Sequence, residues 1–224
     1  MLTDKLPKSG FLSQASETLL DMLTSLANEV KLNQGDVLFE QGDEAREIYA
    51  LIDGLLEVSV LSMDGRKLAL NMLRPGALFG EIALFDPGER TATVTALEPS
   101  VLRRVRYDDV LDQVREEPEL AIDLIHLAGQ RMRWMDRQLN EQVFLPMPTR
   151  LARKILYLTE RPEGGASTLA LSQSELAEFV GATREAVSKT LSGWKKLGVV
   201  DSARGALMVV DRPALHALAD PDQF

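Results

Sequence analysis

The spacing of hydrophobic positions along the chain predicts helices first, then strands, then helices again. Residues 11–30 (FLSQASETLLDMLTSLANEV) carry apolar residues at helical spacing and predict one or two short helices. From about residue 31 to 107, short apolar runs are separated by turn sequences, most of which contain glycine. The runs are VLFEQ, IYALI, LLEVSVL, LALNML and SVLRRVRY. Because no strand–helix–strand alternation appears, we expect a β-sandwich or barrel and not a Rossmann-type domain.

Helical spacing returns at Asp108 and continues in a longer segment that ends near Phe144. Within it, apolar residues recur at alternating spacings of three and four, which is typical of the narrow seam of a coiled coil. These residues are Ile125, Ala128, Met132, Met135 and Leu139. A narrow seam needs a partner, and a second copy of the same helix is the simplest one, so we predict a homodimer through residues 118–145. The alternative is a helix that packs on its own domain.

The last third of the chain has the outline of a helix-turn-helix. FLPMPTR contains two prolines, which end the long helix and mark a hinge before a further helix at residues 149–159. SQSE, which begins at Ser172, is a capping box that opens a short helix. Gly181 supplies a tight turn, and Thr183 caps the next helix, REAVSKTLSGWKKLG. VVDSARGALMVV then predicts a hairpin with Arg204 at its tip, which would form a wing.

The second helix of this module carries residue types that read DNA bases. Val187 and Leu191 are one turn apart and should face inward, which leaves polar side chains on the outer face. Lys195 and Lys196 at the helix end are placed either for backbone phosphates or for the negative pole of the helix. The alternative is a solvated amphipathic helix without a nucleic-acid target. The predicted DNA-contacting residues are Ser172, Thr183, Arg184, Glu185, Ser188, Lys189, Lys195 and Arg204.

Composition narrows the class of protein. The chain has 224 residues, enough for two modest domains, and 45% hydrophobic with 26% charged residues is ordinary for a globular protein. The net charge of −9 argues against binding to nucleic acid, but residues 146–224 hold ten Lys and Arg against nine Asp and Glu, so this part of the chain can approach a polyanion.

The absence of cysteine excludes disulfides, iron–sulfur clusters and cysteine-ligated zinc. Without a signal-peptide pattern or a long apolar run, we expect a cytoplasmic protein with no membrane segment. No nucleophile–base set or metal cluster indicates an enzyme.

The stretch FGEIALFDPGERTA places one carboxylate, Glu81, and one cation, Arg90, beside a run of apolar residues. A packed core has no use for Glu81, and a plain surface loop has little use for the apolar run. The combination predicts a lined pocket with one acceptor and one cation. The alternative is a local ion pair of Glu81 with Arg90 that braces the turn. Exposed pairs of that kind contribute about 0–1 kcal/mol, which would hardly require apolar surroundings.

In this order, a short-stranded β domain, FGEIALFDPGERTA, a seam helix and LSQSELAEFVGATREAVSKTLSGWKKLGVV resemble the cyclic AMP receptor protein/FNR (CRP/FNR) superfamily of bacterial transcription regulators. The resemblance covers nearly the whole chain. It implies an α+β protein with an N-terminal β jelly-roll cyclic-nucleotide-binding domain (1–117), a long dimerisation helix (118–145) and a C-terminal winged helix-turn-helix (146–224). It also implies sequence-specific binding to double-stranded DNA under allosteric control, and contact with RNA polymerase.

The resemblance further implies that FGEIALFDPGERTA is a phosphate-binding cassette, and the chemistry of its residues agrees. Glu81 can accept from a ribose 2′-hydroxyl, and Gly80 lets the backbone approach the sugar. Arg90 can hold the cyclic phosphate through charge-assisted hydrogen bonds, and Thr91 adds a hydroxyl and an amide. The predicted effector-binding residues are Gly80, Glu81, Ile82, Ala83, Arg90, Thr91, Met135 and Asp136.

The last two of these residues depart from the family pattern. Members that bind cyclic AMP often carry a Thr-Ser pair on the dimer helix, where this chain has Met135 and Asp136. A thioether cannot replace a hydroxyl donor, whereas Asp136 could accept from the amine of adenine or from guanine N1 and N2, or could point into solvent. We therefore expect a cyclic nucleotide, cyclic AMP or cyclic GMP, as effector and leave the choice between them open.

Other effectors and other functions are alternatives. The chain has only His126 and His216 as histidine ligands for haem, so we expect no haem, no iron–sulfur cluster and no metal. A second hypothesis is a constitutive or otherwise triggered DNA-binding regulator whose pocket does not bind cyclic nucleotides. A third is a cyclic-nucleotide-regulated protein that acts on a protein partner instead of DNA.

Overall fold

The computed structural model describes residues 6, 12, 15–63, 65, 67–159, 168–169, 171–203 and 206–220. The chain divides into two compact units. The first comprises Met1–Asp64 and Leu70–Met135, and the second comprises Gly65–Ala69 and Asp136–Phe224. The boundary between Met135 and Asp136 therefore lies inside the long helical segment that carries the predicted seam.

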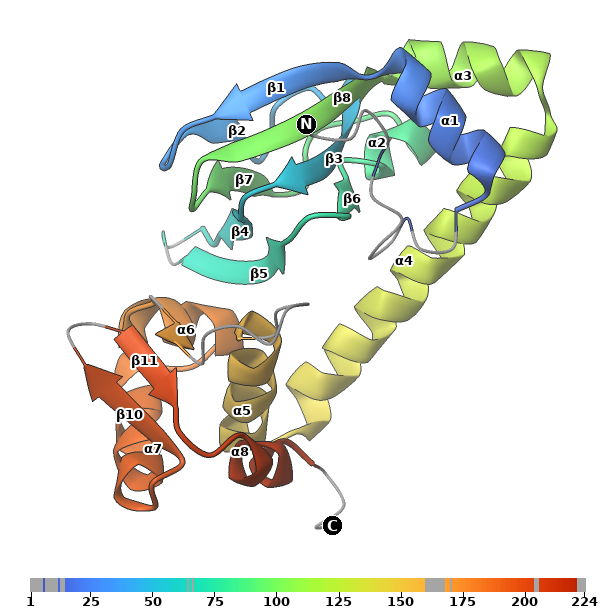
Figure 1. Ribbon diagram of the computed structural model, residues 1–224. Helices are drawn as coiled ribbons and strands as arrows, with labels where there is room; N and C mark the ends of the chain where they lie inside the picture. The colour runs from blue at the N-terminus through green and yellow to red at the C-terminus, as the bar shows by residue number, and fades with distance from the viewer. Residues whose placement is uncertain are drawn as a thin grey trace. The chain divides into compact units, whose positions relative to one another are not determined.

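The first unit is a β domain with two four-stranded sheets (Figure 1). The strand order is β1-β8-β3-β6 in one sheet and β2-β7-β4-β5 in the other. The longest pairing is antiparallel and joins β3 to β8, with Glu47 opposite Arg106 and Leu51 opposite Leu102. The strands are β1 (Asn28–Leu32), β2 (Val37–Phe39), β3 (Glu47–Asp53), β4 (Leu56–Leu61), β5 (Lys67–Leu73), β6 (Leu78–Phe79), β7 (Thr93–Ala96) and β8 (Ser100–Arg106).

All five apolar runs that predicted strands lie on strands, namely β2, β3, β4, β5 and β8, but three further strands were not predicted. One of them, β1, corrects the helical interpretation of residues 11–30. The described residues of that stretch contain one α-helix, α1 (Glu17–Leu26), and the last residues of the stretch already pair with β8, with Val30 opposite Leu102. A short apolar stretch without strict alternation takes its conformation from the strand beside it.

Helices cover the sheet that contains β3 and β8. These are α1, α3 (Tyr107–Glu116) and the first part of α4 (Glu119–Phe144), while the one-turn helix α2 (Ile82–Phe85) follows β6. Leu19 and Leu23 of α1, Val110 of α3 and Leu120 of α4 share one buried cluster with Ile48 of β3. A second cluster lies between the sheets and contains Leu51, Leu56, Phe79, Val94 and Leu102. Burial of these apolar side chains is the main force that holds the two sheets and the helices together.

The long helix α4 combines both interpretations of its apolar pattern. Leu120, Leu124 and Leu127 are buried in the core of the first unit, so this face packs on its own domain. A different face leaves large apolar side chains exposed, and these include four of the five seam residues. The exposed side chains are Ile122, Ile125, Met132, Met135, Leu139, Val143 and Phe144.

The second unit contains the predicted helix-turn-helix and a small sheet with the order β10-β11-β9. α5 (Met147–Leu158) follows α4, with Pro146 at its N-cap and Pro148 in its first turn, where a missing amide proton costs nothing. The hairpin predicted as a wing is β10 (Val200–Ala203) with β11 (Ala206–Val209), and Arg204 lies outside the described residues. The remaining elements are β9 (Thr168–Leu169), α6 (Gln173–Val180), α7 (Arg184–Lys196) and α8 (Arg212–Ala219). The chain is thus an α+β protein, as predicted, although β9 and α8 were not.

Candidate effector pocket and DNA-binding surface

The cassette predicted around Glu81 is a sharp turn between β6 and α2. Gly80 adopts a φ of +80°, and a Cβ added there would lie 2.7 Å from Nη1 of Arg90 and 3.1 Å from the carbonyl oxygen of Glu47. Both the backbone conformation and the space therefore require glycine. Glu81 occupies the N-cap position of α2 but makes no side-chain capping bond. Its carboxylate is consequently directed to another group.

That group is Arg131 of α4. Nε of Arg131 lies 2.7 Å from Oε1 of Glu81, and the Arg131 guanidinium also lies 5.3 Å from the ring centroid of Trp134. The other carboxylate oxygen of Glu81, Oε2, is buried and has no hydrogen-bond partner among the described residues. The local ion pair of Glu81 with Arg90, considered from the sequence, is therefore replaced by a pair of Glu81 with a helix 50 positions further along the chain.

Arg90 is also buried, and its guanidinium is held by the backbone of the unit. Nη1 donates to the carbonyl oxygen of Gly80 at 3.3 Å and Nη2 donates to that of Glu47 at 2.9 Å. Its Cζ lies 4.1 Å from the ring centroid of Phe39. Nε has no hydrogen-bond partner among the described residues. Nη2 of Arg90 also lies 3.6 Å from Oε2 of Glu47. The guanidinium is therefore rigidly oriented, and Nε is the nitrogen left without a hydrogen bond among the described residues.

Tyr107, the first residue of α3, completes the support of Arg90. Its hydroxyl accepts from Nη1 of Arg90 at 3.2 Å and donates to the carbonyl oxygen of Gly80. Burial raises the pKa of Tyr107 to about 12, and the nearby Arg90 charge opposes that rise only in part. The phenol therefore keeps its proton at neutral pH and remains able to donate. Sequence reasoning missed Tyr107, because it reads as the end of a strand.

A cavity of about 70 Å³ lies beside these residues. Six of the predicted effector-binding residues line it, and Phe39, Glu89 and Arg131 add to its wall. The six are Gly80, Glu81, Ile82, Ala83, Arg90 and Thr91. Met135 and Asp136 do not line it: Met135 is 52% exposed, and Asp136 accepts a hydrogen bond from Asn140 at 3.2 Å. The cavity is smaller than the about 300–1,000 Å³ of most ligand pockets.

In the second unit, the predicted caps of the helix-turn-helix are present. Ser172 and Glu175 form the capping box: the Glu175 amide donates to Oγ of Ser172 at 3.2 Å and the Ser172 amide to Oε2 of Glu175 at 2.7 Å. The hydroxyl of Thr183 accepts from the Ala186 amide at 3.2 Å and caps α7. Gly181, with a φ of +59°, ends α6 in the left-handed conformation. These bonds fix where α7 begins.

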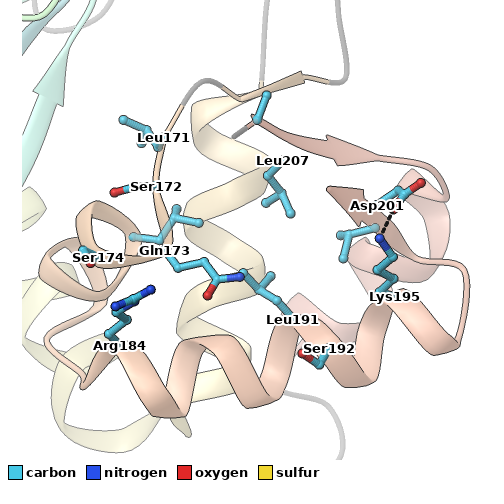
Figure 2. A pocket seen from close by; sticks show the side chains of 13 residues that line it. Leu171, Ser172, Gln173, Ser174, Arg184, Leu191, Ser192, Lys195, Asp201 and Leu207 are labelled. Carbon is cyan, nitrogen blue, oxygen red and sulfur yellow. Dashed lines mark ion pairs between the residues drawn. The ribbon is translucent and has the colours of Figure 1, made fainter. Parts of the chain in front are cut away.

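The side chains of α7 divide as the sequence predicts. Val187 and Leu191 are buried, whereas Arg184, Glu185 and Lys189 are exposed and Ser188 is partly exposed. Arg184 lies at one end of a groove of about 400 Å³ between the start of α6, α7 and the β10–β11 hairpin (Figure 2). Lys195, predicted to contact phosphates, lies at the other end, where its Nζ is 2.6 Å from Oδ1 of Asp201.

Both parts of the molecule match known families. Residues 29–117 match the cyclic nucleotide-binding domain, and residues 149–218 match the Crp-like helix-turn-helix domain. The chain is 32% identical over 186 residues to the cyclic AMP receptor protein of Thermus thermophilus. The aligned residues cover 83% of this chain and 85% of that protein. The chain belongs to the CRP/FNR family of transcription regulators.

Other CRP/FNR relatives extend the match along the chain. It is 27% identical over 215 residues to the CRP-like cAMP-activated global transcriptional regulator of Mycobacterium tuberculosis, across 94% of this chain and 96% of that protein. A CRP/FNR family regulator of Thermus thermophilus has a solved structure with a TM-score of 0.73 and 28% identity, across 86% of this chain and 98% of the other. The protein is thus a DNA-binding transcription regulator with a cyclic nucleotide-binding domain, and not an enzyme.

The described residues also bear on membrane segments and metal sites. None of their helices is both long and apolar enough to cross a membrane. They also contain no group of three His, Asp or Glu side chains that could hold a metal ion.

Proposed function

We propose that this CRP/FNR regulator binds a cyclic nucleotide, cyclic AMP or cyclic GMP, at the cassette and that the nucleotide controls binding of a homodimer to DNA. One observation carries the proposal. Oε2 of Glu81, an acceptor, and Nε of Arg90, a donor, are both buried without a hydrogen-bond partner in the described part of the chain, and both residues line one cavity. Buried polar atoms are nearly always paired, so an unpaired acceptor and donor indicate a ligand with the opposite groups. A cyclic nucleotide offers a donating ribose hydroxyl and an accepting phosphate.

Binding requires the cavity to grow from about 70 Å³, and the Glu81–Arg131 ion pair is the contact that must change. A ligand hydroxyl at the unpaired Oε2 would share the Glu81 carboxylate with Arg131, which holds Oε1, and would weaken that ion pair. Because Arg131 lies on α4, a new partner for Arg131 alters the packing of the helix that carries the seam. Effector affinity and DNA affinity are then linked reciprocally, since each ligand favours one arrangement of the same helix.

The homodimer rests on the exposed apolar face of α4. Ile125, Met132, Met135 and Leu139 are each more than half exposed and follow the spacing of a coiled-coil seam. A second copy of α4 would bury them. Two copies of α7 would then be presented to successive major grooves, about 34 Å apart. The seam continues at both ends, through Ile122 and Val143.

The outer face of α7 would read the DNA sequence. Arg184 is exposed at the start of the helix, where residues that enter the major groove lie, and its guanidinium can contact guanine in a bidentate manner. Glu185, Ser188 and Lys189 would contact neighbouring bases or phosphates. RNA polymerase is the further partner of this function, because a regulator bound to DNA acts on transcription by the polymerase.

A second candidate function has its own support. Both terminal nitrogens of Arg90 already donate to carbonyl oxygens, and Oε1 of Glu81 is already paired with Arg131. A pocket satisfied to this degree by the protein itself would also suit a constitutive or otherwise triggered regulator whose pocket is structural. Met135 and Asp136, in place of the Thr-Ser pair, favour the same function.

Calorimetric titration of the purified protein with cyclic AMP and with cyclic GMP separates the two functions. The effector proposal expects saturable heat with one of them, loss of that heat in Glu81→Gln, and a nucleotide-dependent change in affinity for duplex DNA. Glu44→Gln is the matched control, because Glu44 is exposed and pairs with Arg46 outside the cavity. If neither nucleotide gives heat while DNA binding persists, the constitutive function is correct.

A further inference from the structure

The groove beside α7 separates the recognition helix from the hairpin. It has a volume of about 400 Å³, with Gln173 and Arg184 at one end, Lys195 and Asp201 at the other, and leucine side chains between them (Figure 2). The groove is partly open to solvent, so side chains leave part of the space between α7 and the strands unfilled. Besides the buried apolar residues of α7 and the strands, contacts at particular points help to fix the distance between helix and hairpin.

One such point is the backbone at the root of the hairpin. The amide of Val199 donates to the carbonyl oxygen of Trp194 at 2.9 Å, and the amide of Gly198 donates to that of Lys195 at 3.1 Å. Gly198 has a φ of +74°, which turns the chain sharply out of α7. These bonds hold Gly198 and Val199, just after the helix, but they do not extend along the four-residue strands of the hairpin.

The second point is the ion pair that crosses the end of the groove. Nζ of Lys195, in the last turn of α7, lies 2.6 Å from Oδ1 of Asp201, the second residue of β10. Asp201 lies opposite Met208 of β11 in the hairpin. An ion pair that holds Asp201 in place therefore also constrains β11. The carboxylate also cancels the Lys195 charge, which leaves this end of the groove with little attraction for a polyanion.

We propose that Lys195 and Asp201 are positioning residues that set the distance between the recognition helix and the hairpin, and that Lys195 does not contact DNA phosphates. The proposal rests on the proposed DNA-binding function. It assigns Lys195 a role opposite to that expected from its place at the end of a recognition helix.

Duplex binding distinguishes the two roles of Lys195, because they predict opposite effects of Asp201→Asn. If the pair positions the hairpin, Lys195→Gln and Asp201→Asn each weaken binding of a mixed-sequence DNA duplex by about two- to fivefold, as loss of a half-exposed ion pair allows. The double variant is then no weaker than either single variant, and the exchanged pair Lys195→Asp with Asp201→Lys recovers part of the loss. If Lys195 instead contacts a phosphate, Asp201→Asn removes an opposing carboxylate and tightens binding, which would overturn the proposal.

The dependence of affinity on salt gives a second readout. Loss of a phosphate contact lowers the slope of log affinity against log salt by about one, whereas loss of a positioning contact leaves it nearly unchanged. Lys196→Gln is the matched control, because Lys196 is the exposed neighbour at the same helix end and reports the loss of one positive charge there. A slope that falls by about one in Lys195→Gln contradicts the proposal.

Hydrogen exchange of the protein without DNA tests the positioning role separately from DNA binding. Both Lys195→Gln and Asp201→Asn should speed amide exchange in β10 and β11 by a similar factor, while exchange in α5 stays unchanged. If the hairpin amides exchange at the wild-type rate in both variants, the pair does not position the hairpin. If exchange speeds up but the wild-type protein binds no duplex, the positioning role stands and the DNA-binding function fails.

Discussion

Two cations, the buried Arg90 and the partly buried Lys154, are surrounded by different kinds of groups. The Arg90 guanidinium is surrounded by two backbone carbonyls, the hydroxyl of Tyr107 and the carboxylate of Glu47. Lys154 of α5 has aromatic faces instead, with Nζ 5.1 Å from the ring centroid of Phe179 and 5.7 Å from that of Tyr157. Burial lowers the pKa of Lys154 to about 8, and the Glu141 carboxylate opposes the shift only in part.

The lowered pKa of Lys154 makes stability depend on pH in a defined window. Below about pH 8 both folded and unfolded states hold the proton, and the folded state bears the cost of a buried charge. From about pH 8 to the ordinary value of 10.5, the folded state loses the proton while the unfolded state keeps it, so this residue's contribution to stability rises with pH. We expect Lys154→Met to be more stable than the wild type at pH 7, with an advantage that shrinks toward pH 10.

Urea unfolding of both proteins at several pH values between 7 and 10 measures this difference. Lys189→Met, at an exposed position of α7, shows the effect of losing a surface lysine. If the difference in the free energy of unfolding between wild type and Lys154→Met stays constant across this pH range, the lowered pKa of Lys154 is contradicted.

At the scale of elements, the short helices of the second unit depend on their caps. α6 has eight residues and α7 has 13. Isolated helices shorter than about 12–15 residues are only marginally stable in water, so neither helix is expected to be stable without its caps and its packing. Their first turns are tied to Ser172 and Thr183 by bonds that span three residues, so both caps could be predicted from sequence. β9 is only two residues long and depends on its pairing with β11. α8 was not predicted although Asp211 caps it and Pro213 stands in its first turn, and it packs on α5.

We expect Ser172→Ala to lower the free energy of unfolding by about 1 kcal/mol, because the amide of Glu175 loses its acceptor. Ser174→Ala is the control in the same turn, since Ser174 is exposed and does not cap the helix. Its effect should stay within about 0.5 kcal/mol. Chemical denaturation followed by circular dichroism measures both values. Equal losses in the two variants would mean that the capping box contributes nothing particular to stability.

At the scale of the whole molecule, α4 is the helix with two different apolar faces, one buried and one exposed. Its buried leucines belong to the core of the first unit, and its exposed seam continues past Met135, where the second unit begins. A single helix is thus built into both units. Arg131, the ion-pair partner of Glu81, lies on this same helix.

We expect Met132→Glu to weaken self-association at least tenfold, because two unpaired carboxylates would be buried in the seam of the dimer. Gln130→Glu is the matched control: it introduces the same charge about 200° around the helix from Met132. Sedimentation equilibrium over a range of protein concentrations gives both dissociation constants. A wild-type protein that is monomeric at high concentration, or a Met132→Glu protein that still dimerises fully, would rule out this face as the interface.

The sequence was sufficient where the deciding interactions are local. The apolar runs, the capping box, the Thr183 cap and the inward positions of Val187 and Leu191 follow from the periods of strands and helices and from bonds that span three residues. The cassette could also be recognised, because its glycine, carboxylate and arginine lie within one turn of chain. Six of the residues predicted from it line one cavity.

Only the tertiary structure decided which charges meet. Glu81 pairs with Arg131 across 50 positions, and Arg90 is held by Glu47 across 43 and by Tyr107 across 17. The chain holds 25 Lys and Arg and 34 Asp and Glu, so charge alone leaves many partners open to each of them. A buried charge is stable only beside the partner that the packing of distant helices and strands brings within hydrogen-bond distance. That packing places Arg131 in the pocket and pairs Lys195 with Asp201.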